Sequence, residues 1–262
     1  MAKKAMGPLA GIRLLLAEDN NISLEFFYTV LQRAGADVTT TKDGLQALHA
    51  TRKQAFDILV FDLQMPFMTG TELADAIRGE TANPNYKTPM VALTAHLQSD
   101  HFEEVLAHGF DRCQTKPITK NSLIELIQNT MSGTREGAIT RNEAGGVEAM
   151  VWDRSAALTV TGGDEQVAVN MLELLVARLA DQCTQLDKLI HASAFEDAGK
   201  VVHKLHGSAR FCACGQLTDT ARHMENALIS GDSRAITQAM PALEQAAQAL
   251  IAQYRIIAAK RE

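Results

Sequence analysis

Residues 57–70 read DILVFDLQMPFMTG, and this stretch decides how the first half of the chain folds. Its first seven residues form a short, mostly apolar run that predicts a buried β-strand ending on Asp62. The proline and glycine of MPFMTG predict a loop, and TELADAIR predicts a helix directly after it. A buried strand followed at once by a helix is typical of a parallel sheet with helices on both faces.

The same strand-then-helix unit recurs through the first 131 residues. Further strands are predicted at 12–19, 89–95 and 111–114, with a weaker edge strand in DVTTTKDG, and the later helices at 98–108 and 119–131. Five such units predict a (βα)5 doubly wound parallel sheet of the flavodoxin-like type. Functional residues of such sheets gather at the carboxyl ends of the strands.

The second half of the chain has only helical patterns. SGTREGAITRNEAGGV, residues 132–147, is rich in glycine, has mixed charge and predicts a linker. After it come a short helix at 152–158, a long one capped by Asp164, and helices at about 194–212, 215–230 and 233–258. We therefore predict a doubly wound α/β domain at 1–131 with its core at about 10–131, a flexible linker at 132–150, and an antiparallel four-helix bundle at 151–262.

Composition restricts the class of protein. The chain of 262 residues is 46% hydrophobic and 21% charged, which is typical of folded domains, and its net charge of −6 lacks the basic excess of a nucleic-acid binder. We see no apolar run long enough for a membrane span and no signal-peptide core. The four cysteines follow no disulfide framework, so we expect reduced thiols and a cytoplasmic location.

Five polar residues fall at the ends of predicted strands. They are Glu18, Asp19, Asp62, Thr94 and Lys116. Three carboxylates repel one another unless a cation lies among them, and oxygen ligands of that charge suit Mg²⁺. A carboxylate can itself accept a phosphoryl group, whose oxygens a lysine and a threonine would bind. The alternative is that these acids only cap helices and turns.

The segments LLLAEDN, LVFDLQMPFMTG, ALTAH and QTKPI, in this order, resemble the receiver domain of two-component response regulators over about residues 10–131. The resemblance implies that Asp62 is the phosphoacceptor and that the receiver catalyses its own Mg²⁺-dependent phosphorylation and hydrolysis. It also implies a switch role for Thr94, a phosphate-facing Lys116 before a cis Pro117, and a magnesium site made by Glu18, Asp19, Asp62 and the backbone carbonyl of Gln64.

One position departs from the receiver pattern. Cys113 stands where such domains commonly carry an aromatic switch residue. The usual output switch between the threonine and the aromatic residue is therefore not expected in its ordinary form, whereas phosphorylation does not need that aromatic side chain.

A second cluster lies in VVHKLHGSARFCACG, residues 201–215. On a helix, His203 points away from the apolar side and has glycines four residues before and after it, Gly199 and Gly207. Two glycines inside a helix cost roughly 1 kcal/mol each relative to alanine, which suggests that a partner approaches the backbone there. Surrounded by the cations Lys200, Lys204 and Arg210, His203 suits a nucleophile that accepts a phosphoryl group.

Three alternatives to this interpretation remain. His203 could be an ordinary surface histidine. His203, His206, Cys212 and Cys214 could hold a metal ion, although this spacing does not put all four on one helical face. Gly207 could belong to a phosphate-binding turn, although no strand precedes it.

HKLHGSA, followed by Leu217 and Met224–Glu225, resembles the histidine-containing phosphotransfer (Hpt) domain over about residues 151–258. The resemblance implies that His203 is phosphorylated and that Gly207 gives clearance. Here His206 replaces a common lysine, and Ala213 replaces a glycine that often ends the helix. The expected docking surface comprises Gly199, Lys200, Lys204, His206, Gly207 and Arg210.

Together the two halves resemble the C-terminal part of Bar/Gac-type hybrid sensor histidine kinases, in which a receiver precedes an Hpt domain. They imply a phosphorelay: a sensor kinase phosphorylates Asp62, the group is exchanged with His203, and a downstream response regulator receives it. We see no ATP-binding kinase motif, so we expect no kinase activity; a cytoplasmic tail of a membrane-bound kinase fits this expectation. The alternatives are a phosphorylation-regulated binding module and a phosphate sink.

Overall fold

A computed structural model describes residues 7–94, 102–133 and 150–260 of the chain. The chain folds into two compact units, Met1–Glu143 and Ala144–Glu262. The predicted linker at 132–150 falls mostly on residues outside those that the structure describes, so the predicted domain boundaries stay predictions.

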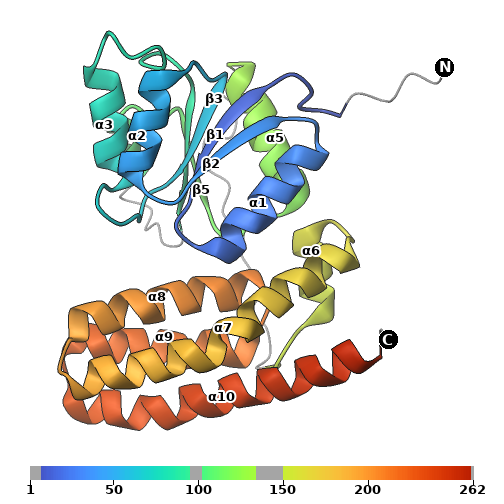
Figure 1. Cartoon of the computed structure of the whole chain (residues 1–262), viewed down its shortest axis with the longest axis vertical. Helices are drawn as coiled ribbons and strands as arrows, with labels where there is room; N and C mark the ends of the chain where they lie inside the picture. The colour runs from blue at the N-terminus through green and yellow to red at the C-terminus, as the bar shows by residue number, and fades with distance from the viewer. Residues whose placement is uncertain (1–6, 95–101, 134–149, 261–262) are drawn as a thin grey trace. The chain divides into compact units, whose positions relative to one another are not determined.

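The N-terminal unit is a five-stranded parallel sheet in the order β2-β1-β3-β4-β5, with helices on both faces (Figure 1). This confirms the predicted (βα)5 fold. Its elements are β1 Arg13–Ala17, α1 Asn21–Arg33, β2 Asp37–Thr41, α2 Gly44–Lys53, β3 Ile58–Asp62, α3 Gly70–Gly79, β4 Met90–Thr94, α4 Phe102–Ala107, β5 Arg112–Thr115 and α5 Lys120–Met131. The first part of the helix predicted at 98–108 lies outside the described residues.

Alternation along the buried strands divides the core between the two faces of the sheet. Leu15, Leu59 and Phe61 pack with α2, α3 and α4 in one cluster of buried side chains. The intervening residues of the same strands, such as Leu16 and Val60, are equally buried. All five residues of β3 and of β4 are buried, because helices cover both faces of a parallel sheet. The apolar run at 57–63 therefore reads as continuous.

Helix caps fix where the chain leaves the carboxyl end of the sheet. The Asn20 side chain accepts hydrogen bonds from the backbone of Ile22 and Ser23 at the start of α1. Thr69 and Glu72 form a capping box at the start of α3. Such caps stabilise a helix by about 1 kcal/mol. They also set the position at which each loop above the sheet must end.

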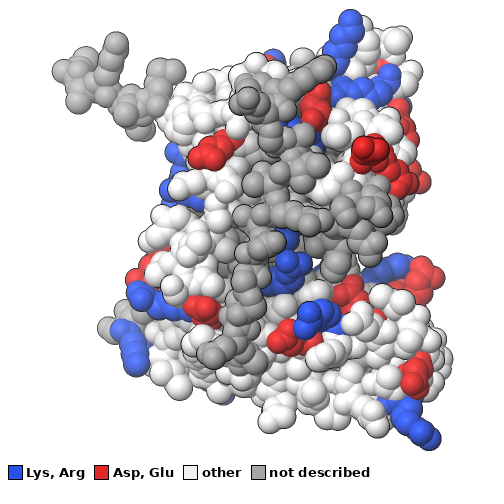
Figure 2. Space-filling view, turned by 180° about the vertical axis from the view of Figure 1, so that it is seen from behind, with Lys and Arg blue, Asp and Glu red and all other residues white. Residues whose placement is uncertain are grey.

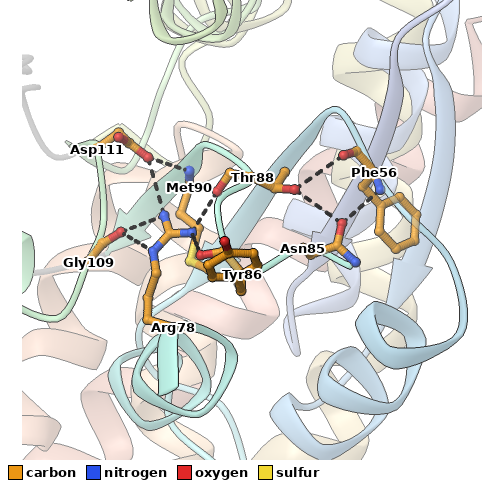
Figure 3. Close-up of polar contacts among 8 residues, drawn as sticks. All are labelled: Phe56, Arg78, Asn85, Tyr86, Thr88, Met90, Gly109 and Asp111. Carbon is orange, nitrogen blue, oxygen red and sulfur yellow. Dashed lines mark hydrogen bonds and ion pairs between the residues drawn. The ribbon is translucent and has the colours of Figure 1, made fainter. Parts of the chain in front are cut away.

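A partly buried arginine, Arg78, ties together the loops at the opposite, amino ends of β4 and β5 (Figure 3). The guanidinium of Arg78, on α3, donates to the carbonyl of Gly109 from two nitrogens at 3.0 and 2.7 Å. It also donates at 2.9 Å to the carbonyls of Tyr86 and Thr88. Asp111, 3.4 Å from the same group, accepts from the backbone of Met90 at 2.8 Å. The network thereby fixes the strands that carry Thr94 and Lys116.

Asn85 makes the corresponding tie to β3. Its side-chain oxygen accepts from the backbone of Phe56 at 2.8 Å, and its amide donates to the carbonyls of Thr51 and Gln54 (Figure 3 draws the Phe56 contact). Asn85 is fully buried, so the oxygen and the nitrogen of its side-chain amide bind protein groups in place of water. The loop between α3 and β4 is therefore held to the end of α2 and the start of β3.

The C-terminal unit is helical throughout its described residues. Its elements are α6 Arg154–Thr161, α7 Glu165–His191, α8 Phe195–Phe211, α9 Gly215–Ser230 and α10 Ser233–Ala259. Each of α7 to α10 packs against two others, α8 with α9, α9 with α10, α10 with α7 and α7 with α8. Short connections make consecutive helices antiparallel (Figure 1). This confirms the predicted bundle; the short helix predicted at 152–158 begins and ends slightly later, as α6.

Charged side chains of both signs are interspersed on the described residues of the face that Figure 2 shows. This mixture is typical of solvent-exposed surface. Among the described helices, none combines the length and the apolar run that a membrane span requires.

Candidate functional site

Three carboxylates meet at the carboxyl end of the sheet. Glu18 and Asp19 follow β1, and Asp62 is the last residue of the adjacent strand β3. One carboxylate oxygen from each lies within 4.8 Å of the others. Glu18 is 1% exposed and Asp62 7% exposed. Three acids this close, two of them buried, form a donor set that suits a small oxygen-seeking cation such as Mg²⁺.

Lys116 joins two of these acids. Its Nζ lies 2.5 Å from Glu18 Oε2 and 2.6 Å from Asp62 Oδ2. Burial lowers the pKa of Lys116, but the charges of Asp62 and Glu18 raise it more, so it ends above its ordinary value. The ammonium group therefore stays charged and offsets the acids. The peptide bond between Lys116 and Pro117 is cis, as predicted.

The pKa of Glu18 is strongly raised. Burial raises it first, the Lys116 charge lowers it, and the Asp62 charge raises it again, so that the pKa rises to about 8. Glu18 thus binds a proton more readily than an exposed glutamate does. A further cation at the cluster would favour its ionised form.

The other residues predicted for this site lie at the same end of the sheet. Thr94 ends β4, is 2% exposed, and accepts a hydrogen bond at its carbonyl from Lys116 N at 2.7 Å. Gln64 N donates to Asp62 Oδ1 at 3.1 Å. The structure therefore brings together all the strand-end residues that the sequence singled out. Their roles stay predictions.

Gly70 keeps the loop after Asp62 tight. A Cβ atom at Gly70 would lie only 2.3 Å from the carbonyl oxygen of Asp62, and Gly70 N donates to the carbonyl of Leu63 at 2.9 Å. No side chain fits between α3 and the end of β3. The glycine of MPFMTG therefore holds the loop against the strand that carries Asp62.

Cys113 lies in the core and not at the cluster of acids. It is 1% exposed, pairs with Ala92 of β4, and belongs to the apolar cluster under α3 and α4. Burial raises the pKa of its thiol to about 12. Cys113 is therefore a protonated, buried thiol that packs like a small apolar side chain.

The second site joins α8 and α9 through one carboxylate. His203 and His206 lie three residues apart on α8, and Glu225 lies on α9. His203 Nδ1 is 2.6 Å from Glu225 Oε1, and His206 Nδ1 is 2.9 Å from Glu225 Oε2. The side chains of His203, Glu225 and His206 are 28%, 15% and 5% exposed, so His203 is the imidazole that solvent reaches.

The electrostatics fix which atoms donate. Burial raises the pKa of Glu225, but hydrogen bonds from His203 and then His206 lower it more, and the pKa falls well below its ordinary range. An ionised carboxylate only accepts hydrogen bonds, so both Nδ1 atoms carry hydrogen. In a neutral imidazole the lone pair is then on Nε2.

The residues predicted for a docking surface around His203 differ in exposure, and their docking role stays a prediction. A Cβ atom at Gly199 or Gly207 would meet nothing within 4 Å, so both positions are open beside the histidine. Lys200 is exposed but lies 3.0 Å from both Glu196 and Asp197 of its own helix, which offset its charge. Lys204 is exposed and Arg210 is half-buried.

His206 does not belong to that surface. It is 4% exposed, and its side chain turns toward Glu225 on the neighbouring helix. Assigning His206 to the docking surface was wrong, because a projection of one helix does not show which helix covers that side. Glu225, the residue that joins the two histidines, was singled out only for the resemblance of Met224–Glu225 to the Hpt pattern and was given no role. A carboxylate one helix after HKLHGSA was the available signal.

The alternative metal site in α8 does not form. Cys212 and Cys214 are buried in the bundle, where burial raises the pKa of both thiols. Over the described ranges, His203, His206, Cys212 and Cys214 do not converge as a group of metal ligands. The two cysteines serve packing.

Two family profiles match the chain. Residues 14–128 match the profile described as a response regulator receiver domain, and residues 170–253 match the Hpt domain. The receiver of the Francisella response regulator 1452 is 28% identical with a TM-score of 0.44, covering 48% of this chain and 100% of that one. The receiver of sensor histidine kinase PA1611 from Pseudomonas aeruginosa PAO1, described with a magnesium ion in its active-site cleft, is also 28% identical with a TM-score of 0.44, covering 47% and 99%.

Similar curated proteins are longer. Sensor protein GacS of Pseudomonas syringae pv. syringae is 32% identical over 94% of this chain, which covers 28% of GacS. Signal transduction histidine-protein kinase BarA of Escherichia coli K12 is 25% identical over 83% of this chain, which covers 24% of BarA. The chain thus spans about a quarter of these relatives. It joins a response regulator receiver domain to an Hpt domain, as the sequence predicted.

Proposed function

We propose that the chain is a segment of a phosphorelay, in which Asp62 accepts a phosphoryl group and exchanges it with His203. The observation that carries this proposal is the 2.6 Å hydrogen bond between His203 Nδ1 and Glu225. It leaves the nucleophilic lone pair on Nε2 of a partly exposed imidazole, within an Hpt domain that follows a receiver domain.

At the receiver, an oxygen of Asp62 is the nucleophile. Its carboxylate attacks phosphorus, an acyl-phosphate bond forms, and the bond to the donor's histidine nitrogen breaks. Lys116, already within 2.6 Å of Asp62 Oδ2, binds the transferred oxygens, and Thr94 contributes its hydroxyl. Binding of the negative group weakens the contacts of Lys116 to the acids, so the lysine follows the phosphoryl group.

The cluster fits Mg²⁺. Glu18, Asp19, Asp62 and the carbonyl of Gln64 would hold the ion, and the three carboxylates lie close enough for one cation to contact them together. When bound, Mg²⁺ supplies positive charge that offsets the acids and the phosphoryl oxygens. The remaining acid charge is offset by Lys116.

At the Hpt domain, Nε2 of His203 attacks the acyl-phosphate. The N–P bond forms as the P–O bond to Asp62 breaks, and the carboxylate of Asp62 is regenerated. The imidazole gains positive charge, which Glu225 offsets through Nδ1. Both transfers are reversible, so the direction of flow depends on the partners.

The partners follow from this chemistry. A sensor histidine kinase supplies the group to Asp62, and a downstream receiver takes it from His203. Neither of the two matched domains is a kinase domain, so the chain acts by phosphotransfer, and its receiver catalyses its own phosphorylation and hydrolysis. A cytoplasmic location suits these partners, with the chain forming part of a longer hybrid kinase.

Chemical stability of the label tests the proposal. The chain is phosphorylated from a small-molecule donor or a kinase with Mg²⁺, as wild type, Asp62→Asn and His203→Gln. Base-labile label should require Asp62, and acid-labile label should require His203. If the wild-type receiver is phosphorylated but never passes label to His203, the relay is overturned and a binding module is favoured. If label reaches His203 but no downstream receiver takes it, the chain acts as a phosphate sink.

A further inference from the structure

His206 is the residue that the resemblance to Hpt domains explains least. It stands in HKLHGSA where many such domains carry lysine, yet its side chain is 5% exposed and faces a carboxylate. A lysine at this position would offer a fixed positive charge. An imidazole buried against Glu225 is set up for a different task.

We propose that His206 is a positioning residue, which acts on His203 through Glu225 and makes no contact with the phosphoryl group. This rests on the proposed role of His203 as the phosphoacceptor. The reactive nitrogen is Nε2 of His203, and the task of His206 is to keep the carboxylate that selects this nitrogen in place.

The geometry of the shared carboxylate supports the assignment. Glu225 receives one imidazole at each oxygen, His203 at Oε1 and His206 at Oε2. Residues three apart on α8 lie on the same side of the helix, so a single glutamate on α9 reaches both. Two donors at opposite oxygens fix the plane of a carboxylate, whereas a carboxylate with one donor turns about its last carbon–carbon bond.

Exposure separates the two imidazoles. The side chain of His203 is 28% exposed and that of His206 is 5% exposed, although both donate to the same residue. An incoming phosphoryl group therefore reaches the ring of His203. His206 lies behind Glu225, where its contribution to transfer passes through that carboxylate.

The charge state of Glu225 supports the same assignment. The two imidazoles lower its pKa well below the ordinary range despite its burial. Loss of the second donor would raise that pKa and leave His203 as the only imidazole bound to the carboxylate. A supporting partner of this kind fixes the tautomer of the reactive imidazole, as outer partners do for histidines that bind metals.

Two substitutions of His206 distinguish the effect of its hydrogen bond to Glu225 from the effect of its positive charge. In His206→Asn the amide nitrogen takes the place of Nδ1 and donates to Glu225 but is never charged, whereas His206→Leu removes the donor. Both are made in the whole chain carrying Asp62→Asn, so that phosphoramidate cannot label Asp62, and label at His203 is the label that His203→Gln removes. We expect the initial labelling rate to fall about tenfold in the leucine variant and to stay within about threefold of the parent in the asparagine variant.

Nitrogen-15 spectra of the histidine rings give a readout that a purely structural role would not move. The parent and His206→Asn should show His203 with hydrogen on Nδ1, and His206→Leu should show a mixture of tautomers. His223→Leu, an exposed histidine of the same α9, is the matched control and should change neither rate nor tautomer.

Two results would overturn the proposal, and a third result would overturn only the relay on which it rests. If His203 is labelled as slowly in His206→Asn as in His206→Leu, and the rate recovers in His206→Lys, then transfer depends on the positive charge of residue 206 and not on its hydrogen bond. An unchanged rate and tautomer in the leucine variant would show that His206 only packs. If His203 takes no label in any variant, the proposed relay fails, and the nitrogen-15 spectra of the rings still test the positioning role. If His206→Leu does not fold, the comparison of His206→Asn with the parent tests that role.

Discussion

Lys116 Nζ lies 2.6 Å from Oδ2 of Asp62, although the two residues are 54 positions apart in the sequence. The contact joins the end of β3 to the turn after β5, with β4 between them in the sheet. Because a second buried acid, Glu18, shares the same ammonium group, one lysine offsets two carboxylates. Stability and phosphorylation at this end of the sheet therefore depend on the same side chain.

Replacing Lys116 by methionine should lower the stability of the receiver and prevent phosphorylation of Asp62. Breaking a buried ion pair from one side costs about 3 kcal/mol or more, because the remaining charge loses its partner. We expect that loss in urea denaturation of the receiver at pH 7, followed by circular dichroism, together with loss of label at Asp62. The exposed Lys53, replaced in the same way, should leave both unchanged. Equal stability of the two variants would contradict the shared role.

Gly70→Ala should disturb the acceptor loop. The new Cβ would lie 2.3 Å from the Asp62 carbonyl, so the loop must shift, at a cost of about 1–3 kcal/mol. Label at Asp62 should fall as the carboxylate moves. Gly79→Ala, at the other end of α3, meets nothing within 4 Å and should leave stability unchanged or slightly raised. Matching behaviour of the two alanine variants would argue against the close approach.

Arg78→Lys should weaken the receiver without touching the acids. A single ammonium group cannot reproduce the fork that reaches Gly109, Tyr86 and Thr88, so we expect a loss of roughly 3 kcal/mol. Thermal denaturation by circular dichroism measures it. Arg52→Lys is the control, since its pair with Glu80 is exposed and contributes at most about 1 kcal/mol. A similar loss of stability in both variants would contradict a special contribution from the bonds of Arg78 to the three carbonyls.

Glu225→Gln should flatten the acid side of the stability profile of the Hpt domain. The folded-state pKa of Glu225 is lowered, so its stabilisation is complete above its ordinary pKa of about 4.5 and is lost as the pH falls below that value. The single tryptophan, Trp152, is buried in this unit and reports its unfolding by fluorescence. A wild-type profile as flat as that of the variant below pH 4.5 would contradict the assignment.

Gly207→Leu should separate transfer from stability. The position opens onto empty space, so the leucine should fold normally, and removing a helical glycine gains up to about 1 kcal/mol. Transfer from a phosphorylated receiver to His203 should nonetheless fall at least about tenfold, because the side chain stands where the partner approaches. Ile229, exposed on α9, replaced by alanine serves as the control. Normal transfer in Gly207→Leu would remove the docking role of the glycine.

Much of the fold could be predicted because each buried strand ends where a polar residue begins. The run before Asp62 and the run before Thr94 set strand positions, and the parallel topology then placed their ends together. The same logic brought Lys116 to the acids. These contacts follow from sheet geometry, which repeats from one such fold to the next.

The contacts between helices could not be predicted in this way. A single-helix projection showed that His203 points outward, but the environment of His206 depends on α9, whose rotation no pattern in α8 reveals. The bonds of Arg78 to backbone carbonyls were likewise invisible, because every residue has a carbonyl and only the packed loops decide which ones face the guanidinium. For Arg78 the sequence carries no signal of its partners, and for His206 the one signal is the carboxylate in Met224–Glu225.

The chain supplies Glu18 and Asp62 long before Lys116. When β1, β2 and β3 have been synthesised, all three acids of the cluster are present, but the turn after β5 that carries Lys116 is not. Closing the sheet around two buried carboxylates in that interval would leave their charge without the ammonium group that offsets it. We therefore expect burial of Asp62 to become favourable only when the turn after β5 has brought Lys116 to the sheet.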